Sequence, residues 1–172
     1  MHRNMLVFLG LCVVLALTAG VWGEDPAPAT ADPTEGATYI GEAGCKKCHI
    51  KEHRTWKKMK HCSAWDVLPE KYRTMDAVDE GTGKACISCH VTGWGEQARG
   101  GFVDPATSEH LLGVQCEACH GPGSKHRDAG QKVMDEKREG FAEGEKSFIL
   151  LKTTNCADCH NPHVSHAKYK DG

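Results

Sequence analysis

Apolar residues are grouped in only a few stretches of this chain, and two of those stretches have the spacing of helices. Residues 50–68 contain neither glycine nor proline and place Trp56 and Met59 three positions apart, which predicts a helix over this segment. A second helix is predicted over residues 126–138, closed by Gly140.

Most other segments carry the residue types of loops. Residues 81–84 and the glycine-rich residues 92–108 indicate loops, whereas residues 147–151 form an apolar run too short to assign. Nowhere do two alternating runs meet at a tight hairpin signal. The pattern therefore predicts a mainly α, loop-rich domain.

The amino terminus has the layout of an export signal. Arg3 precedes an uncharged apolar run over residues 5–19, and small residues follow that run. We expect residues 1–23 to be a signal peptide and the mature protein to be periplasmic or otherwise exported. The alternative is an uncleaved membrane anchor, since residues 5–23 reach the length of about 17–25 residues that a membrane span needs.

The composition changes twice after this leader. Residues 24–38 are rich in proline, alanine and acids without apolar periodicity, which indicates a flexible linker. Residues 39–172 are enough for one domain but hold a modest supply of large apolar side chains. Something else must therefore supply much of the core.

The pattern C-x-x-C-H occurs four times, and this pattern is the attachment site of a covalently bound haem. Two thiols separated by two residues can form thioether bonds to the haem, and the next residue places an imidazole on the iron. We therefore expect four haem c groups, with the core built around them. The cysteines are Cys45 and Cys48, Cys86 and Cys89, Cys116 and Cys119, and Cys156 and Cys159, and the histidines are His49, His90, His120 and His160.

Zinc sites and thioredoxin-like redox sites also use C-x-x-C pairs. A zinc ribbon gives no reason for a histidine after every pair, and a thioredoxin-like site needs a single pair within a βαβ pattern. The motif starts are separated by 41, 30 and 40 residues, which does not match a stacked repeat. The repeated unit is therefore a cofactor-binding motif and not a structural repeat, and the histidine after every pair favours haem.

Histidines outside the motifs are candidates for the second axial ligand of an iron. His61 lies 12 residues after His49, a rise of about 18 Å in a helix, so it must serve a different haem, if any. His163 is too close to His160 to pass round a haem edge, and nearly the same holds for His126 and the motif before it. Distal ligation would therefore join separate motifs.

The remaining candidates differ in their surroundings. His53 lies among lysines and arginines and His110 lies in a polar stretch, so both are expected at the surface. Methionine ligation is not favoured, and the extra Cys62 is expected to be a buried structural residue because no base is arranged beside it. The additional iron ligands are expected to be His61, His126 and one of His163 and His166.

Charge is distributed unevenly along the chain. The net charge is −2, and loss of the leader with Arg3 makes it −3, so there is no strong case for nucleic-acid binding. One short stretch is basic and contains Glu52 as its only acid. It is either a docking patch for an acidic partner or a solvated helix face that also neutralises haem propionates. Its cations are Lys46, Lys47, Lys51, Arg54, Lys57, Lys58 and Lys60.

Five segments spread over nearly the whole mature domain resemble the tetrahaem cytochrome c-554 family, namely residues 39–41, 56–61, 89–95, 113–123 and 156–160. The resemblance implies that His61 is the distal ligand of the fourth haem and His126 that of the first. It also implies that the iron on His90 is five-coordinate, with an open face.

The chain departs from the family pattern near its end. In the family, the distal ligand of the third haem comes from an extension beyond the fourth motif, whereas this sequence has 12 residues after His160. We expect either that His163 or His166 takes that place, or that the third haem is also open.

Taken together, these features predict a periplasmic tetrahaem cytochrome that transfers electrons between redox partner proteins. One alternative is a small enzyme that binds or reduces nitric oxide or a related nitrogen compound at the open iron on His90. Another is a membrane-anchored quinol dehydrogenase subunit, which would require the leader to stay attached. The haem iron would carry the redox chemistry, and the polypeptide would set ligands, exposure and spacing.

The intact mass of the exported protein tests cofactor load and processing together. We expect a chain that begins near Gly20 or Glu24 and carries four covalent haems, because all four motifs are complete. A mass with three haems, or with bound zinc, would contradict the haem assignment. Retention of residues 1–19 would instead favour the anchored alternative.

Overall fold

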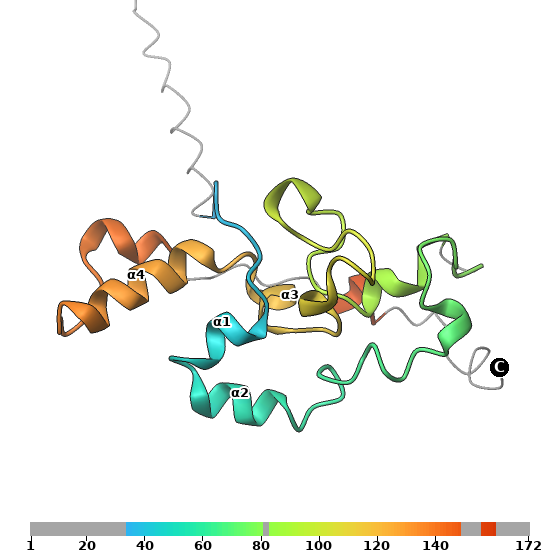
Figure 1. Ribbon diagram of the computed structural model, residues 1–172, viewed down its shortest axis with the longest axis horizontal. Coiled ribbons are helices and arrows are strands. Elements are labelled where there is room, and N and C mark those ends of the chain that lie inside the picture. Colours follow the sequence, from blue (N-terminus) through green and yellow to red (C-terminus); the bar gives the residue numbers. More distant parts are fainter. Residues whose placement is uncertain (1–33, 81–82, 149–155, 161–172) are drawn as a thin grey trace, which may run out of the picture. The chain divides into compact units, whose positions relative to one another are not determined.

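The computed structural model describes residues 34–80, 83–148 and 156–160, and Figure 1 shows their arrangement. The predicted signal peptide, residues 24–33 of the predicted linker and the candidates His163 and His166 lie outside these residues. In the described part of the chain, no helix has the length and apolar character needed to cross a membrane.

Short helices joined by loops make up the described structure, as the sequence predicts. In this part of the chain there are isolated antiparallel bridges, Val78 with Ala85 and Val91 with Leu112, but no strands. The α-helices are α1 (Glu42–Lys46), α2 (Ile50–Trp56), α3 (Cys116–His120) and α4 (Ser124–Asp135). The 3₁₀ helices are η1 (Glu70–Tyr72), η2 (Cys86–Cys89), η3 (Gln97–Arg99), η4 (Glu109–Leu111), η5 (Glu143–Phe148) and η6 (Cys156–Asp158).

Helix α2 ends at Trp56, so the prediction of a helix as far as residue 68 is wrong. After Trp56 the backbone makes successive tight turns, in which the Cys62 N–H donates to the Met59 carbonyl. Tertiary contacts select these turns: the Trp56 indole donates to the Val114 carbonyl at 2.9 Å, and the Val114 N–H donates to the His61 carbonyl at 3.1 Å. Pairing with a distant segment thus overrides local helix propensity.

Helix α4 confirms the second predicted helix, but it ends differently from the expectation. The left-handed residue after the helix is Lys137, with φ 50°, and not Gly140. The Arg138 N–H donates to the Val133 carbonyl and the Lys137 N–H to the Met134 carbonyl, which is the Schellman arrangement. Arg138 also forms an ion pair with Glu145 at 2.9 Å, which helps to hold the chain in this turn.

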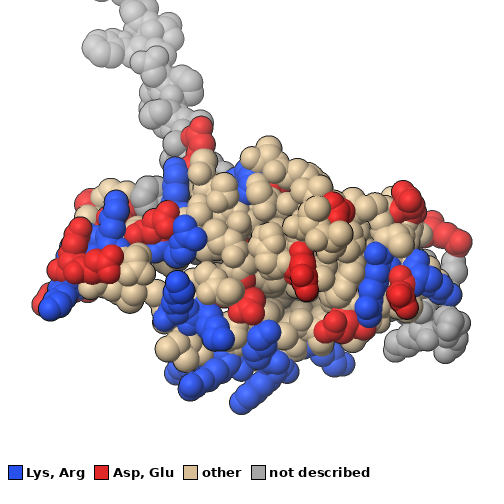
Figure 2. Space-filling model, viewed as in Figure 1, with Lys and Arg blue, Asp and Glu red and all other residues tan. Residues whose placement is uncertain are grey.

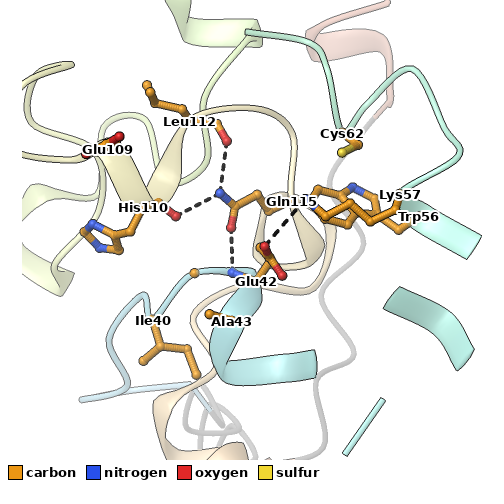
Figure 3. Close-up of a pocket in the computed structure, with 11 residues that line it drawn as sticks. Ile40, Glu42, Ala43, Trp56, Lys57, Cys62, Glu109, His110, Leu112 and Gln115 are labelled. Atoms are coloured by element: carbon orange, nitrogen blue, oxygen red, sulfur yellow. Dashed lines mark hydrogen bonds and ion pairs between the residues drawn. The ribbon is translucent and has the colours of Figure 1, made fainter. Parts of the chain in front are cut away.

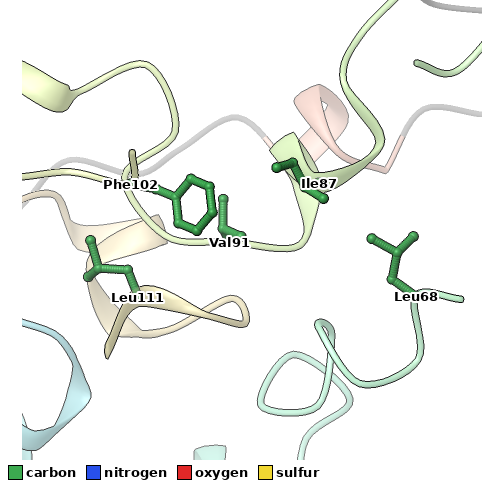
Figure 4. Close-up of a cluster of buried hydrophobic side chains, with 5 residues drawn as sticks. All are labelled: Leu68, Ile87, Val91, Phe102 and Leu111. Carbon is green, nitrogen blue, oxygen red and sulfur yellow. The ribbon is translucent and has the colours of Figure 1, made fainter. Parts of the chain in front are cut away.

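A small apolar cluster forms the protein core around the second motif, which contributes Ile87 (Figure 4). It consists of Leu68, Ile87, Val91, Phe102 and Leu111. The glycine-rich loop of residues 92–108 folds over this cluster, since the Phe102 N–H donates to the Gly93 carbonyl at 3.0 Å. A Cβ on Gly101 would lie 2.3 Å from the Gly93 oxygen, so close backbone approach requires glycine there.

The carboxylate of Glu117 joins three segments of the chain. Glu117 is 1% exposed and accepts N–H bonds from Ile40 at 3.1 Å, Gly41 at 2.8 Å and Gly123 at 2.7 Å. Burial raises the pKa of this carboxyl, and the backbone donors oppose that shift. The segment before α1, helix α3 and the start of α4 therefore meet at one side chain.

The residues just before Tyr39 also pack on the domain. Thr34 and Ala37 are buried, and the Thr38 N–H donates to the Ser124 hydroxyl at 2.8 Å. The Arg99 guanidinium donates to the carbonyls of Thr34 and Ala37. The packed region therefore includes residues 34–38, which composition alone places in the linker.

Replacement of Glu117 by glutamine should destabilise the protein by about 2–3 kcal/mol, because the amide has one acceptor oxygen and turns its NH₂ toward backbone donors. The free energy of unfolding in guanidinium chloride measures this loss. Glu70→Gln, on the exposed face of η1, is the matched control and should change it by less than about 0.5 kcal/mol. Equal free energies of unfolding for the two variants would contradict the proposed contribution of Glu117 to stability.

Candidate haem-binding sites

Each C-x-x-C-H motif is folded into a helical turn. Motif one runs from α1 into α2, motif two forms η2, motif three forms α3 and motif four forms η6. The His49 N–H donates to the Cys45 carbonyl at 3.0 Å, and the His160 N–H to the Cys156 carbonyl at 2.8 Å. Because positions three and four apart share a helix face, both thiols and the imidazole of a motif are directed to one side. No disulfide joins the motif cysteines in the described part of the chain.

The fourth motif lies opposite His61. The Nε2 atoms of His61 and His160 are 3.4 Å apart, and their ring centroids are 5.7 Å apart. A metal bound at about 2 Å by each imidazole would separate these nitrogens by about 4 Å. The pair therefore has nearly the spacing of two axial ligands of one iron, and the residues fit a haem here.

The first motif lies opposite His126 of α4. The rings of His49 and His126 are nearly parallel, with centroids 5.9 Å apart and an interplanar angle of 22°. A cavity of about 230 Å³ adjoins both rings and the thiols of Cys45 and Cys48, and its other lining residues are largely apolar. This combination of two thiols, two imidazoles and an apolar hollow also fits a haem.

Two lining residues of this cavity were not identified from the sequence. Met134 lies beside Cys48, with the two sulfur atoms 4.0 Å apart, and Phe141 stacks on His126 at 5.6 Å. Helical spacing could have signalled the first, since His126, Gly130 and Met134 lie four residues apart on one face of α4. Nothing in the sequence pattern signalled Phe141, which lies beyond the end of that helix.

The imidazole of His90 is oriented by the backbone. Its Nδ1 donates to the carbonyl oxygen of Ala64 at 2.5 Å. This bond leaves Nε2 as the nitrogen able to bind a metal, which is the usual support for a ligating histidine. Ala64, which accepts the bond, is 26 positions away in the sequence. Because it accepts through its backbone carbonyl, no side chain in the sequence could have predicted this contact.

The third site is described only in part. His120 ends α3 and is exposed, and its two distal candidates, His163 and His166, lie outside the described residues.

The motifs lie in two adjacent pairs. Helix α1 lies against α3, and interaction between the Cys45 and Cys116 thiols lowers the pKa of Cys116 and raises that of Cys45. The Cys89 thiol donates to the Asp158 carbonyl oxygen at 3.9 Å, and interaction with Cys159 lowers the pKa of Cys89. Motif one therefore adjoins motif three, and motif two adjoins motif four.

His53 is buried, so the prediction that it lies at the surface is wrong. Its side chain is 7% exposed, touches the Glu42 carboxylate and packs against the Trp56 ring at 5.5 Å. A histidine on the inner side of α2 can pair with the carboxylate at the start of α1, and this contact holds the two helices together around motif one. His110 is exposed, as predicted.

A second cavity of about 260 Å³ lies between α1 and the segment before α3 (Figure 3). The Gln115 amide spans it, donating to the carbonyls of His110 and Leu112 and accepting from the Glu42 N–H at 2.6 Å. Cys62 lines the cavity and is half-buried, less enclosed than expected. None of the motif thiols lines it, and Ile40 is the lining residue that it shares with the His49–His126 cavity.

Comparison with known proteins places these sites in a family. The family model described as cytochrome c554 and c-prime matches residues 44–121. The curated protein cytochrome c-554 of Nitrosomonas europaea is 34% identical over 140 residues. The match covers 72% of this chain and 58% of that relative, and no solved structure matches.

The match includes the first three motifs and the buried Glu117. The Glu117 carboxylate accepts N–H bonds from Gly41, just before α1, and from Gly123, just before α4, and these two helices carry residues of the first site. It favours covalent haem c over zinc as the group that the motifs bind. This chain belongs to the cytochrome c-554 family of c-type cytochromes.

Proposed function

We propose that this chain is an exported tetrahaem cytochrome that carries single electrons between redox partner proteins. The observation that supports this most directly is that two histidine pairs, His61 with His160 and His49 with His126, have nearly the spacing of two axial ligands. A bound haem supplies an iron that exchanges one electron reversibly. Two imidazoles on one iron leave no free position for substrate, which suits a carrier.

The proposed ligand sets follow from these contacts and from the family. His49, His90, His120 and His160 bind the four irons on the proximal side. His61 completes the fourth site and His126 the first, while His163 or His166 is the candidate for the third. The four cysteine pairs of the motifs bind the haems covalently.

The pairing of motifs supports transfer within the protein. The Glu42 N–H of α1 donates to the Gln115 amide oxygen just before α3 at 2.6 Å, and the Cys89 thiol donates to the Asp158 carbonyl at 3.9 Å, so the attachment points of each pair lie close together. The Lys84 ammonium donates to the Asp158 carbonyl at 3.1 Å and further ties motif four to the segment before motif two. The polypeptide thus sets the separation and relative orientation of its redox groups.

A second candidate function is binding or reduction of nitric oxide, or a related nitrogen compound, at His90. Its Nδ1–H bond to Ala64 holds the imidazole ready to bind iron from one side. Family membership supports an open position on the opposite side. An open face is necessary for such an enzyme but not sufficient, because catalysis also needs a positioned acid or base.

The alanine variants His61→Ala and His126→Ala test the proposed distal ligands. Each should convert one low-spin site to a high-spin site while all four haems stay attached, because the thioether bonds do not depend on the distal imidazole. Electron paramagnetic resonance and intact mass measure the two properties. His110→Ala, at an exposed histidine, is the control and should leave the spectrum unchanged. Undiminished low-spin intensity in either variant would remove that histidine from the ligand set.

A nitric oxide titration separates carrier from enzyme. We expect the native protein to contain a minority of high-spin haem that binds nitric oxide or cyanide without sustained turnover. Reversible reduction of all four irons should accompany this behaviour. Steady consumption of nitric oxide or hydroxylamine at about 1 to 1,000 per second would favour the enzyme instead. Fully six-coordinate spectra would refute the open site.

A further inference from the structure

The cations between residues 46 and 60 form an exposed surface, which we call the basic face. It consists of the side chains of Lys46, Lys47, Lys51, Arg54, Lys58 and Lys60. Figure 2 shows lysine and arginine gathered along the lower edge of the view, over α1 and α2. Residues 42–60 contain seven cations and two carboxylates, a net charge of +5, in a chain whose total is −2. The rest of the chain is therefore acidic.

The basic face surrounds the first haem attachment motif. Lys46 and Lys47 are the two residues between Cys45 and Cys48, and Lys51 lies on the first turn of α2. His49, the proposed iron ligand of the first site, lies between these lysines in the sequence. A protein bound to the basic face would thus lie directly against the first site.

Fold stability does not account for these charges. Lys57 is the cation of this stretch that serves the fold, since it pairs with Glu42 at 3.6 Å and lies over the Trp56 ring. Among the described residues, no carboxylate forms an ion pair with Lys46, Lys47 or Lys51. Concentrating like charges without partners costs energy, which a complementary partner would offset.

Apolar side chains are exposed within the basic face. Ile50 is 52% exposed and Met59 is 50% exposed, and both lie in sequence between its lysines. A small apolar contact area inside a charged rim is the composition of a transient protein interface.

We propose that the basic face is the docking surface for an acidic redox protein, which exchanges electrons with this chain at the first attachment motif. This inference rests on the proposed electron-transfer function. Charge complementarity selects the partner class, and the exposed Ile50 and Met59 supply the short-range contact once the partner is bound. An anionic membrane is the competing occupant, and the experiment below separates the two.

The test uses the holoprotein and a plant-type [2Fe–2S] ferredoxin as the acidic probe. Binding of the oxidised proteins is measured by calorimetry at low ionic strength, so that no electron moves. The variant Lys51→Glu/Arg54→Glu/Lys58→Glu reverses three charges outside the attachment motifs. The control Lys71→Glu/Lys132→Glu/Lys137→Glu reverses three exposed charges elsewhere and changes net charge equally.

We expect the first variant to weaken ferredoxin binding at least about tenfold and the control less than about twofold. The difference should shrink at 0.15 M salt, where the Debye length falls to about 8 Å. The second-order rate constant for reduction by ferredoxin should likewise fall strongly in the first variant and only slightly in the control.

Equal losses in both variants would overturn the proposal, because total charge and not the basic face would then control binding. So would absence of ferredoxin binding by the wild-type protein. Loss of sedimentation with phosphatidylserine vesicles in the first variant, with ferredoxin binding intact, would assign the face to a membrane. Failure of the electron-transfer function itself would appear separately, as an absence of reversible reduction by dithionite in the wild-type protein.

Discussion

The buried carboxylate of Glu117 is the interaction on which the arrangement of the first and third sites depends. It stands inside the third motif and accepts N–H bonds from Gly41, just before α1, and from Gly123, just before α4. The first bond brings Cys45 beside Cys116, and the second places α4 so that His126 lies opposite His49. Because one carboxylate accepts both bonds, one side chain positions two sites.

The remainder of the fold is held by few contacts. Among the described residues, the main apolar cluster has five buried side chains, which is small for a domain of this length. The structure compensates with backbone bonds between distant segments, such as those that His90 and Thr92 make to residues 111–113. Covalent haem, which the family attaches through its motifs, is a reason why such a chain needs little core of its own.

Charge and redox chemistry are organised around the same motif. Lys46 and Lys47 occupy the variable positions of the first attachment motif, whereas the corresponding positions of the third hold Glu117 and Ala118. The first motif therefore faces solvent with a positive surface, and the third turns its charged residue inward to bind backbone. The same local pattern thus serves an exposed site in one place and an anchor for the fold in another.

The sequence by itself determined the chemistry of the motifs, the mainly helical class and helix α4, because these depend on residues within a few positions of one another. The prediction that His61 and His49 serve different haems assumed a continuous helix, whereas α2 ends at Trp56, and it is the tertiary structure that places His61 opposite His160. Only the tertiary structure decided that α2 stops at Trp56 and that His53 is buried, and it brings together the imidazole pairs that family resemblance alone had implied. Those outcomes depend on contacts between residues far apart in the chain, such as His61 with His160 across 99 positions, and no local pattern encodes them.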